Sequence, residues 1–182
     1  ITQVYGDRDV VVTVGRDRFR ETGTKYVHPE FLYIFNIQTI AGEGANVLAE
    51  PKSALLTEKL ATKYYGNRNP IGELLELENS TQVFVKGVVE NPPNQTSMPF
   101  DMLLSWDALG DFSRENADNW GATFTHLYTF VQLSEGQKPA SLKEQLDAFE
   151  KKYLEPDSNN DMSFILQPLK DFHFNANCSS YN

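Results

Sequence analysis

The sequence contains a single cysteine, Cys178, among its 182 residues. A disulfide within the chain is therefore excluded, and so is a zinc site built on several thiolates. No apolar run approaches the roughly 20 residues of a bilayer-spanning helix, and the charged-then-apolar pattern of a signal peptide is lacking. Because the chain opens at Ile1 without an initiator methionine, we expect a soluble piece of a longer protein.

Positive charge is also in short supply. The chain has 16 Lys and Arg residues against 25 Asp and Glu residues, which gives a formal net charge of −9. DNA, RNA and anionic membrane surfaces require a positive footprint, so we expect none of them as the main partner. Hydrophobic residues make up 40% of the chain, which is the composition of a folded domain. The length suffices for one compact domain or two small subdomains.

The best-patterned stretch covers residues 53–93. After a short apolar run, Thr57 offers a side-chain oxygen to the first amides of a helix that starts at Glu58. Leu60, Ala61 and Tyr64 recur at helical spacing, and Gly66 ends the helix. Two strand-like runs at residues 73–78 and 82–89 flank a polar break, which predicts a β-hairpin.

Further elements are predicted on both sides of this stretch. We expect strands at residues 10–14, 16–21, 37–40, 100–104, 124–133 and 162–166, with residues 16–21 as an exposed or edge strand, and a turn at residues 5–9. We expect helices at residues 29–35, 106–112 and from Pro139 to the stop at residues 155–156. The last strand, helix and strand would form a crossover unit. The predicted fold class is α+β, with residues 26–93 inserted as a small α/β lobe into a lobe built from residues 1–25 and 94–182.

The histidines, and the cysteine with its neighbouring aspartate, do not form a convincing active site in the sequence. We interpret His28 as a turn or capping residue and His126 as a structural residue of a strand. Asp171, His173 and Cys178 invite a nucleophile hypothesis, which we do not adopt because they lie at the end of the chain. We therefore predict no catalytic residue, no cofactor and no metal site.

Acidic residues form two groups. Glu76 and Glu78 lie two residues apart near Glu73, and a second group contains Asp157 and Asp161. Paired carboxylates can perform acid and base chemistry on a glycan or a phosphate ester. The first spacing is that of a solvated strand face, however, and the second group lies in a predicted loop. We interpret both groups as surface residues.

Three aromatic residues surround the least patterned part of the chain. Trp106, Phe112 and Trp120 bracket a polar segment at residues 106–123. A polar loop flanked by aromatic side chains is a candidate partner-binding tip. A structural hinge against the inserted lobe is the alternative.

The order of motifs resembles a known family. Tyr64-Tyr65-Gly66 closes the helix, Asn69-Pro70-Ile71-Gly72 follows, and the second strand closes on VKGVVENPP at residues 85–93. This combination resembles the periplasmic core domain of MacB-type ABC-transporter permeases, in the FtsX-like permease superfamily. Segments 26–35, 100–106, 129–136 and 166–173 resemble the family in the same order.

The resemblance implies a two-lobed periplasmic domain with a split βαβ, porter-like lobe and the inserted α/β lobe. It implies a non-catalytic function on the periplasmic side of the bacterial inner membrane, where the domain couples cytoplasmic ATP hydrolysis to export or mechanotransmission. The implied partners are a cytoplasmic ATP-binding subunit, a periplasmic adaptor or substrate, and a dimer mate. It also implies that the first strand and helix of the end-built lobe, which precede a position like Ile1, are missing from the chain.

Two alternatives remain open at this point. One is a fragment of an extracellular hydrolase that uses paired carboxylates. The other is a free-standing ligand-binding module, which predicts one deep apolar pocket. An apolar stretch before Ile1 and three more after Asn182 would favour the transporter, whereas soluble sequence on both sides would count against it.

Overall fold

The structure is a computed structural model that describes residues 1–6, 9–42, 44–96, 98–110, 126–153 and 163–169. The chain divides into two compact units. The first unit comprises Ile1–Glu115 and Phe124–Val131, and the second comprises Asn116–Thr123 and Gln132–Asn182. Each unit is described by itself.

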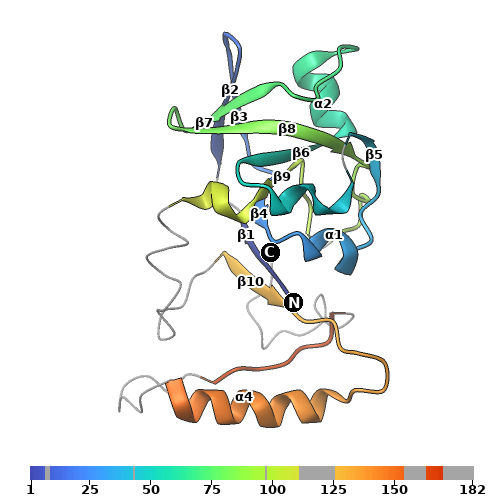
Figure 1. Cartoon of the computed structure of the whole chain (residues 1–182), viewed down its shortest axis with the longest axis vertical. Helices are drawn as coiled ribbons and strands as arrows, with labels where there is room; N and C mark the ends of the chain where they lie inside the picture. The colour runs from blue at the N-terminus through green and yellow to red at the C-terminus, as the bar shows by residue number, and fades with distance from the viewer. Residues whose placement is uncertain (7–8, 43, 97, 111–125, 154–162, 170–182) are drawn as a thin grey trace. The chain divides into compact units, whose positions relative to one another are not determined.

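The first unit is built on one mixed, curled sheet (Figure 1). Its strands are β1 (Thr2–Gly6), β2 (Val10–Val14), β3 (Asp17–Glu21), β4 (Thr24–Val27), β5 (Thr39–Gly42), β6 (Ser53–Thr57), β7 (Leu74–Leu77), β8 (Thr81–Val89), β9 (Met102–Ser105) and β10 (Leu127–Phe130). Their order is β10-β1-β4-β9-β6-β8-β7-β2-β3, with β5 added to β8. The β4–β9 and β6–β8 pairs are parallel and the others antiparallel.

Short helices accompany the sheet in this unit. They are α1 (Glu30–Ile34), α2 (Glu58–Tyr65) and the 3₁₀ helices η1 (Ala45–Ala49) and η2 (Trp106–Leu109). The main core joins the apolar face of α2 to strands β2, β6, β7, β8 and β9. Strands β6 and β9 are buried along their whole length, which explains their continuous apolar sequence.

The predictions for residues 53–93 are confirmed. The Thr57 hydroxyl oxygen accepts a hydrogen bond from the Leu60 amide at 3.3 Å, and α2 ends at Gly66 with a φ of 61°. The hairpin of β7 and β8 turns through Glu78 and Asn79, both at positive φ. The edge position of β3 is confirmed as well, because β3 is the last strand of the sheet.

Several element predictions are wrong. Strand β1 (Thr2–Gly6) includes Tyr5 and Gly6, the first two residues of the turn that we expected at residues 5–9, because pairing with β4 and β10 on both sides overrides the local turn signal. Of the long strand predicted at residues 124–133, the described part forms strand only over Leu127–Phe130. Residues 163–166 run without strand pairing, so the described residues do not form the predicted crossover unit.

The α+β fold class is confirmed, whereas the boundaries of the two lobes stay a prediction. Strand β2, from the segment 1–25, is hydrogen-bonded to β7, from the segment 26–93. Strand β6, from the middle segment, is likewise bonded to β9. The sheet therefore runs without a break through both of the predicted lobes.

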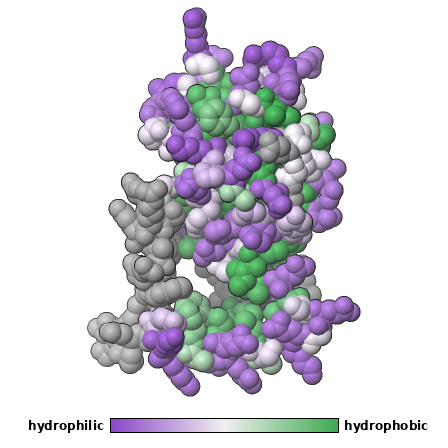
Figure 2. Space-filling model, in the orientation of Figure 1, coloured by the Kyte–Doolittle hydropathy of each residue, from purple (hydrophilic) through white to green (hydrophobic). Residues whose placement is uncertain are grey.

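The second unit contains the helix α4 (Pro139–Tyr153), as the sequence predicts. Phe149 contacts the rings of Tyr153 and Phe164, and the Phe164 amide donates a hydrogen bond to the Glu150 carboxylate. Asp147 pairs with Lys143, one turn earlier in the helix, at 2.9 Å. No residue of α4 is buried, and Figure 2 shows apolar side chains open to view along this helix.

Candidate functional site

Of the three aromatic residues that flank the predicted partner-binding loop, the structure describes Trp106. It begins η2 and is half-buried, and its ring stacks on His28 with 4.6 Å between the ring centroids. Burial lowers the pKa of His28, and the nearby Glu30 carboxylate opposes this effect. Phe112 and Trp120 lie outside the described residues, so the loop stays a prediction.

The two histidines that the structure describes, His28 and His126, contact different residues of β1. His28 Nε2 lies 3.3 Å from the Gln3 side-chain oxygen, and its carbonyl accepts from the Phe31 amide, which confirms it as a turn residue. The His126 carbonyl accepts a hydrogen bond from the Gly6 amide at 3.1 Å. In the part of the chain that the structure describes, no three His, Cys, Asp or Glu residues lie close enough to hold a metal ion. Asp171, His173 and Cys178 lie outside that part.

The two neighbouring carboxylates Glu76 and Glu78 lie in different local structures. Glu76 belongs to β7, whereas Glu78 follows the end of that strand at a φ of 50°. The prediction that both share one strand face is therefore wrong. The Glu78 carboxylate instead accepts a hydrogen bond from the Val11 amide at 2.7 Å. Asp157 and Asp161 lie outside the described residues.

An ionic cluster around the buried Glu21 connects the sheet edge to α2. Glu21, at the end of β3, is buried, and one oxygen of its carboxylate accepts from Lys63 Nζ at 2.7 Å and from the Tyr64 hydroxyl at 2.9 Å. The Phe19 ring packs on Tyr64 with 4.8 Å between centroids. The alternating charges of residues 16–21 predict an exposed strand and give no signal that Glu21 is buried. We regard this cluster as structural because each carboxylate contact joins β3 to α2.

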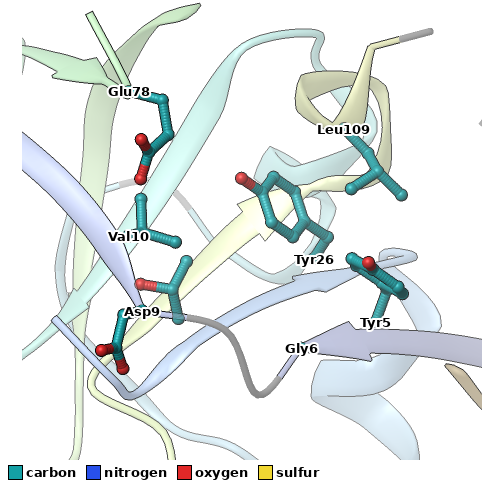
Figure 3. Close-up of a pocket in the computed structure, with 8 residues that line it drawn as sticks. Tyr5, Gly6, Asp9, Val10, Tyr26, Glu78 and Leu109 are labelled. Atoms are coloured by element: carbon teal, nitrogen blue, oxygen red, sulfur yellow. The ribbon is translucent and has the colours of Figure 1, made fainter. Parts of the chain in front are cut away.

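A cavity of the first unit lies beside β1 and β4 and has a volume of about 400 Å³ (Figure 3). Its walls come from segments far apart in the sequence: β1, the start of β2, β4, the turn after β7 and the end of η2. The lining residues are Tyr5, Gly6, Asp9, Val10, Thr24, Tyr26, Glu78 and Leu109. Sequence reasoning missed this cavity, because only the strand order brings these residues together.

Tyr26 and Glu78 supply a hydroxyl group and a carboxylate to the cavity. Figure 3 shows the Tyr26 hydroxyl and the Glu78 carboxylate directed into the same space. Burial raises the pKa of Tyr26 to about 12, and the negative charge of Glu78 and the Tyr5 hydroxyl add to the effect. The Tyr26 and Tyr5 rings lie 6.3 Å apart at 49°. Tyr26 is therefore a neutral hydroxyl at physiological pH.

Thr24 is a second polar residue of the cavity wall. Its side chain is buried, and its hydroxyl has no hydrogen-bond partner among the described residues. Asp9 also lines the cavity, and its carboxylate pairs with Arg20. The cavity thus combines two aromatic rings, apolar side chains and one carboxylate without a cationic partner in the described part of the chain. A free-standing ligand-binding module predicts one deep apolar pocket, whereas the wall of this cavity carries polar and charged side chains as well as apolar ones.

The fold is shared with domains of transport proteins. A domain of a permease protein from Porphyromonas gingivalis is 24% identical with a TM-score of 0.71, and the match covers 86% of this chain and 65% of that one. The periplasmic region of MacB from Actinobacillus actinomycetemcomitans is 12% identical with a TM-score of 0.61, covering 84% and 66%. The extracellular domain of the noncanonic ABC-type transporter YknZ from Gram-positive bacteria is 13% identical with a TM-score of 0.55, covering 82% and 74%.

These similarities define the class of fold as that of the periplasmic and extracellular domains of permeases. The family model described as the MacB-like periplasmic core domain matches residues 1–149, and the chain belongs to this family. No curated protein matches the chain. The chain spans about two thirds of the length of the first two solved structures, 65% and 66%. Among the described helices, none has the length and apolar character to cross a membrane.

Proposed function

We propose that the chain is a non-catalytic extracytoplasmic domain of an ABC-transporter permease, located on the periplasmic side of the bacterial inner membrane. The observation that carries the proposal is the match of the MacB-like periplasmic core domain model to residues 1–149. In the full-length protein, membrane helices would connect the domain to a cytoplasmic ATP-binding subunit. A dimer mate and a periplasmic adaptor or substrate complete the proposed set of partners.

The proposed role is a conformational change that accompanies each cycle of the ATPase, in export or in mechanotransmission. Such a domain needs an interface that binds its partner with different affinity in two conformations. A partner can shift the equilibrium between the two conformations only by the difference in its affinity for them. The continuous hydrogen-bonded sheet from β10 to β3 supports this role, since a displacement at one end is carried along the paired strands. We further propose that the lobe of residues 26–93 moves against the lobe of residues 1–25 and 94–182 through a change in the curvature of the sheet that they share.

The loop that follows Trp106 is the proposed contact with an adaptor or substrate. Trp106 supports this role because its half-buried ring, stacked on His28, leaves part of a large aromatic surface accessible at the start of η2. Aromatic side chains that are held in place and partly exposed are typical anchors of protein interfaces.

The experiment uses the full-length permease, copurified with its neighbouring subunits and reconstituted in lipid nanodiscs. We expect vanadate-sensitive ATP hydrolysis, and we expect the Trp106→Ala variant to lose copurification of its periplasmic partner. Tyr33→Ala is the matched control, because Tyr33 is also an exposed aromatic residue of the first unit at 62% exposure. ATPase activity that is absent from the full assembly would contradict the transporter proposal. Equal partner recovery with Trp106→Ala and Tyr33→Ala would contradict the role of the loop alone.

A further inference from the structure

The cavity beside β1 and β4 has the properties of a small-molecule site. Its volume of about 400 Å³ lies within the range of sites that enclose small organic ligands. Val10 and Leu109 supply apolar wall, while Tyr5 and Tyr26 supply two tilted aromatic rings. The cavity is therefore suited to a ligand with an apolar part.

The charged side chains of the described cavity wall are negative. Among the described lining residues, Asp9 and Glu78 carry charge, and none is Lys or Arg. Asp9 is paired with Arg20, whereas Glu78 has the Val11 amide as its partner and no cationic partner among the described residues. A positively charged ligand would supply the countercharge that Glu78 lacks.

Lys25 does not fill this role. It lies between Thr24 and Tyr26 on β4, and alternate residues of a strand leave from opposite faces. Lys25 is paired with Gly6 of β1, and its side chain lies beside Gly6. Thr24 and Tyr26, which line the cavity, consequently face the other side of the sheet.

The aromatic and hydroxyl groups favour the same ligand. A cation over the face of a tyrosine ring is attracted by the ring quadrupole within about 6 Å of the centroid. Tyr26 stays a neutral ring at physiological pH, so it adds a hydroxyl and a π face rather than a second anion. The buried Thr24 hydroxyl lacks a partner among the described residues, and an N–H of an ammonium group could donate to it.

We propose that this cavity binds a small organic amine, with its ammonium group between the Glu78 carboxylate and the Tyr26 ring and its apolar chain against Val10 and Leu109. The ligand class is a primary alkylammonium or arylalkylammonium ion. The proposal goes beyond the transport role and is tested on the 182-residue chain without an ATP-binding subunit. It can therefore fail while the proposed transport function stands, and the reverse also holds.

The test is isothermal titration of the chain with hexylammonium chloride, with 1-hexanol as the neutral probe of the same chain length. We expect hexylammonium to bind at least about tenfold more tightly than 1-hexanol, a difference of about 1.4 kcal/mol in binding free energy. Glu78→Gln keeps an oxygen for the Val11 amide but removes the charge. We expect it to weaken hexylammonium binding about fivefold to tenfold, as for a partly screened charge pair, and to leave 1-hexanol unchanged.

Glu76→Gln is the matched control, because Glu76 is a carboxylate of the same hairpin that does not line the cavity. We expect it to bind hexylammonium as the native chain does. Tyr26→Phe keeps the ring and should stay within about twofold of native binding, whereas Tyr26→Leu removes the π face and should weaken binding at least about threefold. Equal affinities for hexylammonium and 1-hexanol, equal effects of Glu78→Gln and Glu76→Gln, or no saturable binding of hexylammonium would each overturn the proposal.

Discussion

Two adjacent tyrosines at the end of α2 should respond in opposite directions to the same substitution. Tyr64 and Tyr65 are both buried, at 8% and 5% exposure. The Tyr64 hydroxyl donates to the Glu21 carboxylate at 2.9 Å, whereas the Tyr65 hydroxyl has no hydrogen-bond partner among the described residues. Replacing each tyrosine by phenylalanine removes one oxygen and keeps the ring.

The magnitudes follow from these partners. A hydrogen bond to a charged group contributes about 1.5–3 kcal/mol. Glu21 keeps its contact with Lys63, so we expect Tyr64→Phe to cost about 1.5–2 kcal/mol, at the lower end of that range. Tyr65→Phe removes a buried hydroxyl that gains nothing from the protein, so we expect it to change the free energy of unfolding by zero to about 1 kcal/mol in the stabilising direction.

Urea unfolding followed by far-ultraviolet circular dichroism would measure both variants, with m-values compared to confirm that the same surface is exposed. We expect a difference of about 2 kcal/mol between Tyr64→Phe and Tyr65→Phe. In the double variant with Glu21→Gln, the effect of Tyr64→Phe should shrink, because the charged acceptor is gone. Equal losses for Tyr64→Phe and Tyr65→Phe, or the reverse order, would refute the assignment of the Glu21 cluster.

Alkaline pH provides a second test of the environment of Tyr65. Burial and the nearby Glu73 charge raise the pKa of Tyr65 to about 12, although Arg68 opposes the shift. Because the unfolded chain releases this proton near its ordinary pKa of about 10, the contribution to stability is complete below pH 10 and is lost as pH rises toward 12. Tyr65→Phe should therefore unfold less readily than the native chain at pH 11.

Three further perturbations follow from single contacts. A Cβ on Gly23 would lie 2.8 Å from the Asp101 backbone nitrogen, so we expect Gly23→Ala to lower the free energy of unfolding by about 1–3 kcal/mol in a denaturant titration. Thr57→Ala removes the hydroxyl that caps α2 and should cost about 1 kcal/mol in the same assay. Burial lowers the pKa of His28, so stability should fall as pH drops below its ordinary value of about 6.5, and His28→Gln should flatten this dependence in thermal melts recorded at several pH values.

Local signals predicted the elements whose determinants lie within a few residues. The cap at Thr57, the stop at Gly66 and the turn through Asn79 act on their immediate neighbours, and all three were visible in the sequence. The short strand β1 was missed because its stability comes from pairing with β4 and β10. Strand β10 was overextended because an alternating pattern marks a strand face but does not say where the partner strand ends.

The candidate cavity was beyond the reach of sequence patterns for a different reason. Tyr5, Tyr26 and Glu78 are separated by tens of residues and reach one space only through the strand order of the curled sheet. Glu78 also leaves the alternation of β7, because its backbone adopts a positive φ in the turn. A pattern of charges along a strand cannot anticipate that a single turn residue rotates its side chain away from its neighbours.

The connection between β3 and β4 links the cavity to the rest of the sheet. Glu21 binds α2 on one side of this connection, and Thr24 begins the cavity wall on the other. Between them, the Gly23 carbonyl accepts from the Asp101 amide at 2.7 Å, and the Asp101 carbonyl accepts from the Thr57 amide at 2.9 Å. If the sheet changes its curvature during a transport cycle, this bonded path moves Thr24 together with the cap of α2. An amine whose affinity differs between the two curvatures would then shift the equilibrium between them. The shift equals the ratio of the two affinities, because coupling between a ligand and a conformational equilibrium is reciprocal.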